Sequence, residues 1–307
     1  MEYNFGDDNI RSRETSESKN TITSVNHDKV SKTSSFSVEK TLYLLLPYLH
    51  IKWNYRIYYF LLQVMFSSYF GPGGGKVLVL KFFVGKNSFF NEVFVKFGWG
   101  WTLSLILLLR LACMPLHSNW RQHLRNLLIR VSSLTLFFYL FCQVCFPFIE
   151  EYTGRCVKQG IIQENIGKKR CVKMGNSFYS FDISGHSYLM IYCILSIMEE
   201  SKELIYVLCL GQLVRKSFST SAVEKDSSAS SFPEDEVQNL GKKYSVILPF
   251  IVGFSVCIFC LSLLWDIMLV ITTLYYHTFI EKFLGTSLAI AMWYIQYHVY
   301  FLSYNVL

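Results

Sequence analysis

Apolar residues in this chain gather in long blocks that polar stretches separate, instead of alternating along short segments. A block of about twenty apolar residues is long enough to cross the hydrocarbon core of a bilayer as a helix. The pattern predicts an all-α, polytopic membrane protein with six transmembrane helices. The predicted spans run over Thr41–Phe70, Glu92–Cys113, Val131–Phe148, His186–Val214, Tyr244–Tyr276 and Phe283–Tyr304.

Polar stretches set the expected domain boundaries. Residues 1–40 are rich in Ser, Thr, Asn and charge, a composition that favours a disordered cytoplasmic N-terminus. The transmembrane domain then covers residues 41–304, and residues 305–307 form a short cytoplasmic C-terminus. Within the domain, the Ser-rich, acidic stretch 215–243 is expected to be a flexible cytoplasmic linker.

Acidic residues interrupt two of the predicted spans. Glu199 and Glu200 stand inside the fourth apolar block, so either the helix ends there and a surface helix follows, or one long helix carries both acids inside the membrane. Asp266 lies inside the fifth block and is expected to face a partner or a wet cavity.

Composition supports the membrane assignment. Hydrophobic residues make up 52% of the 307, charged residues only 17%, and the mean hydropathy is +0.30. The net charge is +7, but the basic residues are scattered through loops, which argues against nucleic-acid binding. No cysteine spacing resembles a zinc site. Cys156 and Cys171 flank a polar loop and could form a disulfide in an oxidising lumen.

Six spans place both termini on the same side, which we expect to be the cytoplasm. His186 and His277 then come to the opposite membrane face, although they are ninety-one positions apart. The positive-inside rule supports this topology only in part. The presumed lumenal loop carries six basic residues, the wrong sign for that side: Arg155, Lys158, Lys168, Lys169, Arg170 and Lys173.

A Phe-Asp-Ile-Ser-Gly-His block stands directly before the fourth apolar run. It is typical of a helix start, with Asp182 or Ser184 as the cap and His186 in the first turn. Helix N-termini bind phosphate through unpaired N–H groups, Gly185 lets an anion approach, and histidine exchanges protons near neutral pH. The alternative is a capped helix whose histidine has only an interfacial role.

Four stretches resemble the fat storage-inducing transmembrane family, which acts in lipid-droplet formation at the endoplasmic reticulum. They are residues 91–102, 149–156, 181–200 and 275–286 together with Trp293-Tyr294. The resemblance implies a six-span bundle like that of the lipid phosphate phosphatases, with both termini cytoplasmic and the active face lumenal. It also implies an acyl-CoA diphosphatase, which yields acyl 4′-phosphopantetheine and adenosine 3′,5′-bisphosphate without a cofactor.

By this resemblance His186 and His277 are the catalytic residues, and we expect His277 to attack phosphorus while His186 protonates the leaving group. Ser184 and Gly185 would offer N–H groups to phosphate. Asp182 would orient a histidine or cap the helix, and Lys282 would neutralise phosphate or lie at the membrane interface.

The expected ligands are fatty acyl-CoA, diacylglycerol or triacylglycerol, and lipids of the endoplasmic reticulum membrane. Two other functions stay open from the sequence. One is a non-enzymatic protein that binds neutral lipid and promotes droplet budding. The other is a phosphatase that acts on phosphatidate-like lipids.

Overall fold

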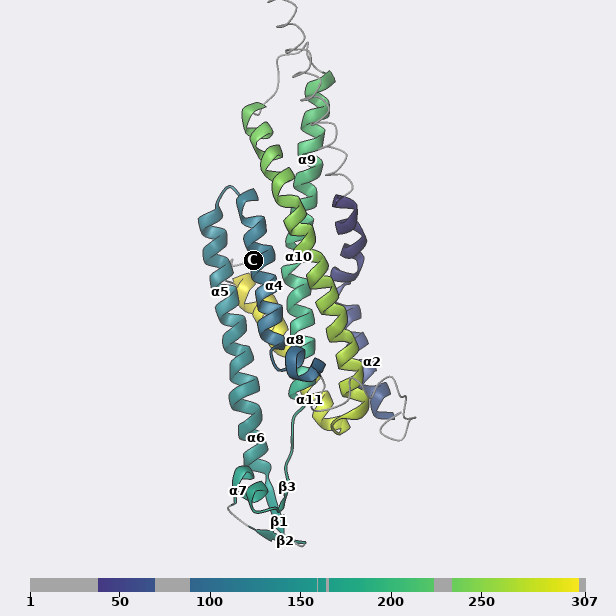
Figure 1. Cartoon of the computed structure of the whole chain (residues 1–307), viewed down its shortest axis with the longest axis vertical. Coiled ribbons are helices and arrows are strands. Elements are labelled where there is room, and N and C mark those ends of the chain that lie inside the picture. Colours follow the sequence, from purple (N-terminus) through teal and green to yellow (C-terminus); the bar gives the residue numbers. More distant parts are fainter. Residues whose placement is uncertain (1–37, 70–88, 159, 164–165, 224–233, 304–307) are drawn as a thin grey trace, which may run out of the picture.

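The computed structural model describes residues 38–69, 89–158, 160–163, 166–223 and 234–303. Helices that lie side by side along the long axis of the molecule make up nearly all of it, as Figure 1 shows. The all-α expectation is therefore confirmed, apart from one small sheet. The ends of the chain at 1–37 and 304–307, and with them the predicted boundary after residue 304, fall outside the described residues, whereas the predicted boundary after residue 40 lies within a helical segment over residues 38–49.

The helices begin with a segment over residues 38–49. In chain order the elements are then α2 (Trp53–Tyr69), η2 (Phe90–Val95), α4 (Gly98–Cys113), η3 (Met114–Leu116), α5 (Trp120–Tyr139), η4 (Leu140–Cys145), α6 (Phe146–Thr153), β1 (Arg155–Lys158), β2 (Ile161–Gln163), α7 (Lys168–Lys173), β3 (Ser177–Tyr179), α8 (Gly185–Glu200), α9 (Glu203–Val223), α10 (Glu234–Tyr275), α11 (Phe279–Tyr294), η5 (Ile295–Tyr300) and α12 (Phe301–Ser303).

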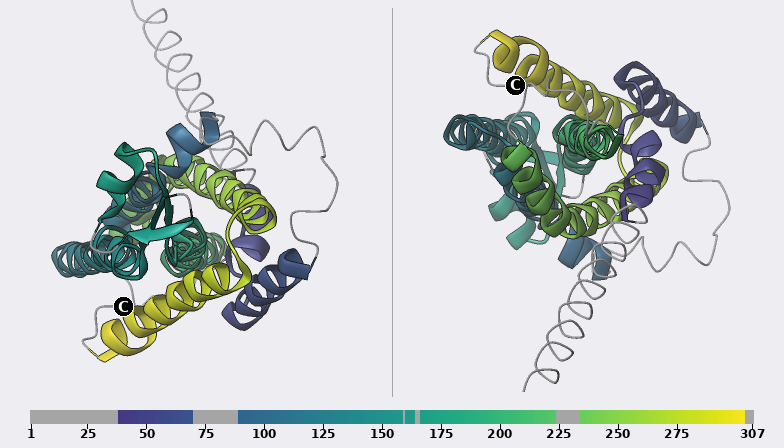
Figure 2. Two further views of the ribbon diagram at one scale, coloured as in Figure 1. Left: turned by 90° about the horizontal axis from the view of Figure 1, so that it is seen from below. Right: turned by 90° about the horizontal axis from the view of Figure 1, so that it is seen from above.

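Helix α8 is the centre of the bundle. All its residues from Ser187 to Glu200 are buried, so no face of the helix is left for solvent or lipid. The surrounding helices include α4, α10 and α11, which all pack against it, and the end-on views of Figure 2 show α8 enclosed between them. A helix that is apolar all round, as this one nearly is, belongs in a core of this kind.

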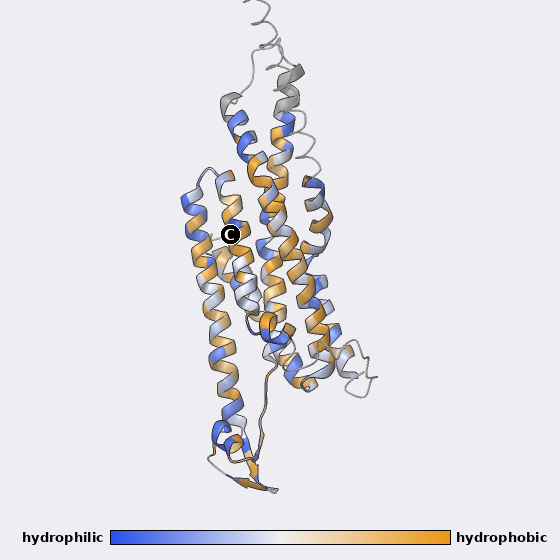
Figure 3. Ribbon diagram, in the orientation of Figure 1, coloured by the Kyte–Doolittle hydropathy of each residue, from blue (hydrophilic) through white to orange (hydrophobic). Residues whose placement is uncertain are grey.

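Within the described part of the chain, three helical stretches are long and apolar enough to cross a membrane: Gly98–Leu116, Trp120–Thr153 and Gln238–Tyr275. Figure 3 shows hydrophobic colour along the middle of the bundle and hydrophilic colour toward its ends. The multi-pass character is confirmed by these helices, whereas the count of six spans stays a prediction.

The helix boundaries differ from the expected spans in two places. The first block contains two helices, 38–49 and α2, because the chain breaks around Ile51 and Lys52. The expected linker 215–243 is helical at both ends, since α9 continues to Val223 and α10 begins at Glu234. Only its middle, residues 224–233, lies outside the described part.

The two glutamates of the fourth block lie inside the bundle. Helix α8 ends at Glu200, a turn follows at Ser201 and Lys202, and α9 continues from Glu203. Glu200 Oε1 accepts hydrogen bonds from Arg130 Nη2 at 2.7 Å and from Tyr297 Oη at 2.9 Å. The helix thus ends at the glutamates, as the first alternative expected, but the acids themselves are buried and paired.

Asp266 also has its partners within the chain. Its Oδ2 atom accepts hydrogen bonds from Arg56 Nη2 at 2.8 Å and from Tyr48 Oη at 2.5 Å. The acid therefore ties α10 to α2 and to the segment 38–49 through Oδ2. That it also faces a partner protein or a wet cavity stays a prediction.

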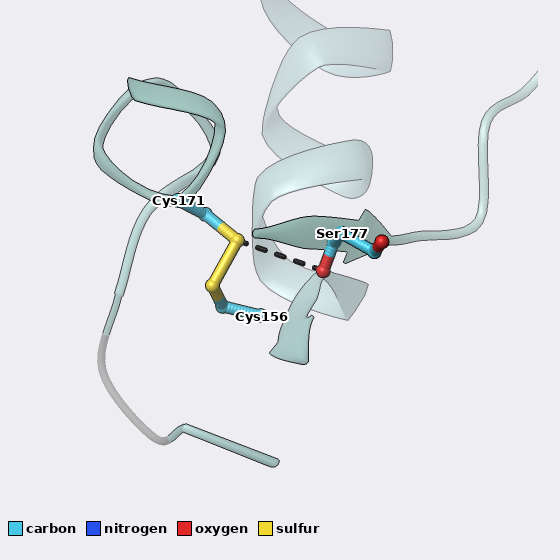
Figure 4. Close-up of a disulfide and its surroundings, with 3 residues drawn as sticks. All are labelled: Cys156, Cys171 and Ser177. Carbon is cyan, nitrogen blue, oxygen red and sulfur yellow. Dashed lines mark hydrogen bonds between the residues drawn. A yellow bond between two sulfur atoms is a disulfide. The ribbon is translucent and has the colours of Figure 1, made fainter. Parts of the chain in front are cut away.

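A small domain, here called the cap, projects from one end of the bundle at the bottom of Figure 1. It contains β1, β2, α7 and β3, which lie between α6 and α8 in the sequence. Its strands pair antiparallel in the order β2-β1-β3. A disulfide between Cys156 and Cys171 joins β1 to α7, and Figure 4 shows the carbonyl oxygen of Ser177 beside it, 3.6 Å from Cys171 Sγ. The sequence analysis left this disulfide open, and the structure contains it. The small sheet was not predicted.

Removal of one partner from the buried Arg130–Glu200 ion pair should destabilise the protein. Both side chains are almost inaccessible, at 4% and 2% exposed. Arg130→Met leaves the buried Glu200 carboxylate with only the longer ion pair to Arg110, at 3.7 Å, so we expect the free energy of unfolding in detergent to fall by about 3 kcal/mol. The double variant Arg130→Met with Glu200→Met should recover more than half of that loss.

Lys96→Gln is the matched control, because Lys96 pairs with Glu92 on the exposed surface. It should change stability by less than about 1 kcal/mol. A double variant no more stable than Arg130→Met would show that the pair is not the source of the effect.

Candidate active site

Ser184 begins the central helix. It is the N-cap of α8, and its side-chain oxygen accepts a hydrogen bond from the backbone N–H of Ser187 at 3.3 Å. Gly185 and His186 follow in the first turn. The expected helix start is therefore confirmed, and of the two candidate caps it is Ser184, not Asp182, that fills the role.

The second histidine lies in a tight turn between α10 and α11. His277 has a φ of 63°, which makes it the single non-glycine residue with positive φ in the described part of the chain. Histidine tolerates this left-handed conformation better than most residues do, yet it still costs free energy. Residues held this way cluster at functional sites, so the turn is a second pointer to His277.

Glu281 connects the two histidine-bearing segments. Its Oε2 atom accepts a hydrogen bond from the backbone N–H of Thr278 at 2.8 Å, which closes a capping box at the start of α11. Its Oε1 atom accepts from the N–H of Asp182 at 3.3 Å, and its carbonyl oxygen accepts from the N–H of Ser184 at 3.2 Å. One residue thus fixes both loops.

Gly285 permits this close approach of α11 to the start of α8. A Cβ atom at position 285 would stand 2.5 Å from the carbonyl oxygen of Ser184. No real Cβ contact is that short, so any larger residue would push the helix starts apart.

Two acids flank the ring of His277. Its Nδ1 atom lies 3.6 Å from Glu281 Oε2 and 3.9 Å from Asp182 Oδ2. Carboxylates on this side favour a proton on Nδ1, which leaves the lone pair on Nε2. The ring of His186 is held differently, because its Nε2 atom lies 3.2 Å from the amide oxygen Oδ1 of Asn91.

The pKa values of the two acids shift in opposite directions. Burial raises the pKa of Asp182, as do the nearby Glu150 and Glu281, while His277 and Lys168 oppose the rise. Burial acts in the same direction on Glu281, but the hydrogen bonds from Thr278 and Asp182 outweigh it and lower the pKa of that carboxyl. Of the two acids, Glu281 is therefore the one whose hydrogen bonds favour the charged form.

Both histidines line one cavity of about 730 Å³. Its wall combines polar groups with apolar side chains from α6, from α10 and from Ile183, which precedes α8, a mixture suited to an amphipathic ligand. The lining residues are Asn91, Glu92, Lys96, Cys142, Phe146, Pro147, Glu150, Asp182, Ile183, Gly185, His186, Met268, Ile271, Thr272, Tyr276 and His277.

Four of the six expected site residues line this cavity: Asp182, Gly185, His186 and His277. Ser184 does not, because Glu281 occupies its N–H and its hydroxyl caps α8. Lys282 does not either. It is 4% exposed, and its Nζ atom donates to the carbonyl oxygen of Thr273 at 2.7 Å, so it is turned away from any phosphate in the cavity.

The sequence reasoning missed Glu281, Asn91 and Glu150. Glu281 had a visible signal, because Thr278 followed three positions later by Glu is the pattern of a capping box. Within the described residues, no group of three or more His, Cys, Asp or Glu side chains is arranged to hold a metal ion.

Comparison with known proteins gives relatives over most of the chain. A protein of Drosophila melanogaster named acyl-coenzyme A diphosphatase FITM2 is 32% identical over 225 residues, which cover 72% of this chain and 52% of the fly protein. The chain thus matches about half the length of that relative. The proteins of the same name from Xenopus laevis and Homo sapiens are 30% and 28% identical, and the match covers 72% and 70% of their lengths. No solved structure matches the chain.

The family described as fat storage-inducing transmembrane protein matches residues 79–297. That range contains both histidine-bearing segments, the cap and the whole cavity lining. The chain is therefore a member of the fat storage-inducing transmembrane family.

Proposed function

We propose that this chain is a fatty acyl-CoA diphosphatase that supports lipid-droplet formation. The observation that carries the proposal is the convergence of His186 and His277, ninety-one positions apart, on one cavity with an apolar wall. Relatives named acyl-coenzyme A diphosphatase supply the substrate class. The products are acyl 4′-phosphopantetheine and adenosine 3′,5′-bisphosphate.

In the proposed mechanism Nε2 of His277 attacks one phosphorus of the diphosphate. The bridging P–O bond breaks, and His186 gives its proton to the departing phosphate oxygen. Water then attacks the phosphorus bound to His277, passes a proton to His186 and releases the second product. Asp182 and Glu281, 3.9 and 3.6 Å from Nδ1, stabilise the positive charge that His277 acquires.

The apolar wall of the cavity is the proposed site of the acyl chain near the thioester end of the substrate. Phe146, Ile183, Met268 and Ile271 form it, and they lie beside the two histidines. We also propose diacylglycerol, triacylglycerol and other lipids of the endoplasmic reticulum membrane as ligands, and this proposal rests on the family resemblance alone.

We also propose that the active face is lumenal and both termini are cytoplasmic. The cap lies at the same end of the bundle as the histidine cavity, since Lys168 of the cap pairs with Glu150 of the cavity wall. Disulfides persist in oxidising compartments such as the lumen of the endoplasmic reticulum, and the cap contains one. The proposed membrane is accordingly that of the endoplasmic reticulum.

Loss of either histidine should abolish hydrolysis. We expect His186→Ala and His277→Asn to lower single-turnover cleavage of oleoyl-CoA by at least about a hundredfold, with products identified by mass spectrometry. Asn is chosen at position 277 because it also tolerates the left-handed backbone. His123→Ala, at a half-buried histidine outside this cavity, is the control and should keep full activity.

Cleavage of phosphatidate but not of oleoyl-CoA by the wild type would point to the lipid phosphatase instead. If folded histidine variants keep lipid-droplet function and the wild type is inactive, the protein acts as a neutral-lipid binder. Either result would contradict the proposed activity.

Gly285→Ala should separate the two histidine-bearing loops. Since the added methyl group would meet the Ser184 carbonyl at 2.5 Å, we expect kcat to fall at least about tenfold and stability by about 1–3 kcal/mol. Gly253→Ala is the matched control, because nothing lies within 4 Å of a Cβ atom there. Equal effects of the two substitutions would show that helix propensity, and not the contact, is responsible.

The lumenal orientation is open to a glycosylation test. Gly160→Asn with Ile162→Thr creates an acceptor site at the turn between β1 and β2, and Asn suits the positive φ of 83° at position 160. We expect this variant to carry an endoglycosidase-sensitive glycan in microsomes. Asp226→Asn creates an acceptor before Ser227-Ser228 and should stay unmodified. Glycosylation of Asp226→Asn and not of the cap variant would contradict the proposal and place the cap in the cytoplasm.

A further inference from the structure

The cap is strongly basic on the side of the membrane where basic residues are usually avoided. Residues 154–175 contain six Lys and Arg residues and one acid, Glu164. The six basic residues are all exposed: Arg155, Lys158, Lys168, Lys169, Arg170 and Lys173. Membrane insertion disfavours such a loop on the lumenal side, so the charge calls for a different explanation.

The histidine cavity by itself lacks positive charge. Among the described residues its lining includes three acids, Glu92, Glu150 and Asp182, and a single Lys or Arg, Lys96. Lys96 already pairs with Glu92 at 2.6 Å. An acyl-CoA brings a diphosphate and a 3′-phosphate, about four negative charges near neutral pH. These lining residues alone would repel it.

The cap brings cations to this wall. Lys168, the first residue of α7, forms an ion pair with Glu150 of the cavity lining. Its side chain is still half exposed, at 50%, so the ammonium can exchange partners. Lys168 is also close enough to Asp182, another residue of the cavity lining, to affect the pKa of that carboxyl. Lys169 and Arg170 follow in the same helical turn.

The cap is also held in a fixed place against the bundle. The disulfide from Cys171 fastens α7 to β1, and β3 pairs with the other edge of β1. The N–H of Phe181 donates to Thr153 Oγ1 at 3.0 Å, which ties the end of the cap back to α6. The cations of α7 are therefore positioned by structure and not merely present on a loop.

We propose that Lys168, with Lys169 and Arg170, binds the 3′-phosphate of the nucleotide end of acyl-CoA at the mouth of the histidine cavity. This inference rests on the proposed function. In the free protein Glu150 holds Lys168 in place, and the arriving phosphate takes over that ion pair. The three residues act on substrate recognition, while the diphosphate reacts between the histidines.

The test compares oleoyl-CoA with oleoyl-3′-dephospho-CoA, which lacks only the phosphate in question. For the wild type we expect a KM about tenfold lower with oleoyl-CoA, the effect of one charge-assisted hydrogen bond. In Lys168→Gln, and more fully in the triple variant with Lys169→Gln and Arg170→Gln, the KM for oleoyl-CoA should rise to that for the dephospho substrate. The value of kcat should change less than KM.

Two further variants separate recognition from general charge or folding. Lys158→Gln removes an equally exposed cation from β1 of the same cap and should keep the tenfold preference. Glu150→Gln frees Lys168 and removes an acid from the wall, so the KM for oleoyl-CoA should fall. A folding defect would raise it instead.

The outcomes are distinct. A wild type that cleaves neither substrate would refute the proposed function itself. A wild type that cleaves both with equal KM, or a Lys168→Gln variant that raises both KM values by the same factor, would overturn the 3′-phosphate assignment and leave the hydrolase intact.

Discussion

The burial of α8 on every side constrains the whole structure. A helix without an exposed face must satisfy all its polar groups within the protein, and at its ends several backbone groups have no partner inside the helix. At the N-terminal end the Ser184 hydroxyl supplies one acceptor, and the Glu281 carbonyl binds the N–H of Ser184. At the C-terminal end Glu200 is held by Arg130 and Tyr297. These contacts fix the position and rotation of α8, and therefore the place of His186.

The two ends of α8 solve this constraint in different ways. At the C-terminal end the charges are closely paired: Glu200 with Arg130 at 2.7 Å, and Glu203 with Arg110 and His117. At the N-terminal end the separations from His277 to its acids are 3.6 and 3.9 Å, and a cavity of about 730 Å³ lies beside them. A cavity of about 520 Å³ lies at the C-terminal end too, lined by Arg110, Arg130 and Glu203, so the two ends differ in how closely their charges are paired and not in having a cavity. Charges already held in close ion pairs are less available to a ligand than the loosely paired ones around His277. The N-terminal end is therefore the candidate for chemistry.

The sequence predicted the parts of this arrangement that depend on local pattern. A cap residue before an apolar run predicted the start of α8, and the long apolar blocks predicted a helical membrane protein whose topology places His186 and His277 at one end. It did not reveal contacts between distant segments. The bond from Asp182 to Glu281 joins residues ninety-nine positions apart, and Lys282 is turned away by a carbonyl nine positions earlier. Hydropathy also did not predict that the stretch 215–243 is helical at both ends, because charged residues can continue a helix beyond its apolar part.

The location of the site at a helix end fits the demands of the proposed substrate, an acyl-CoA. Such a substrate needs an apolar wall for its chain and a polar, charged environment for its phosphates within one cavity. Inside a helical bundle the backbone is fully hydrogen-bonded, so it cannot offer unusual conformations or unpaired groups there. At the end of the bundle a turn can hold His277 in the left-handed region, and α8 can begin with a capped Ser-Gly-His. The apolar side chains Phe146, Met268 and Ile271 reach the same place from the helices. This boundary supplies both environments, and residues far apart in the sequence converge on it.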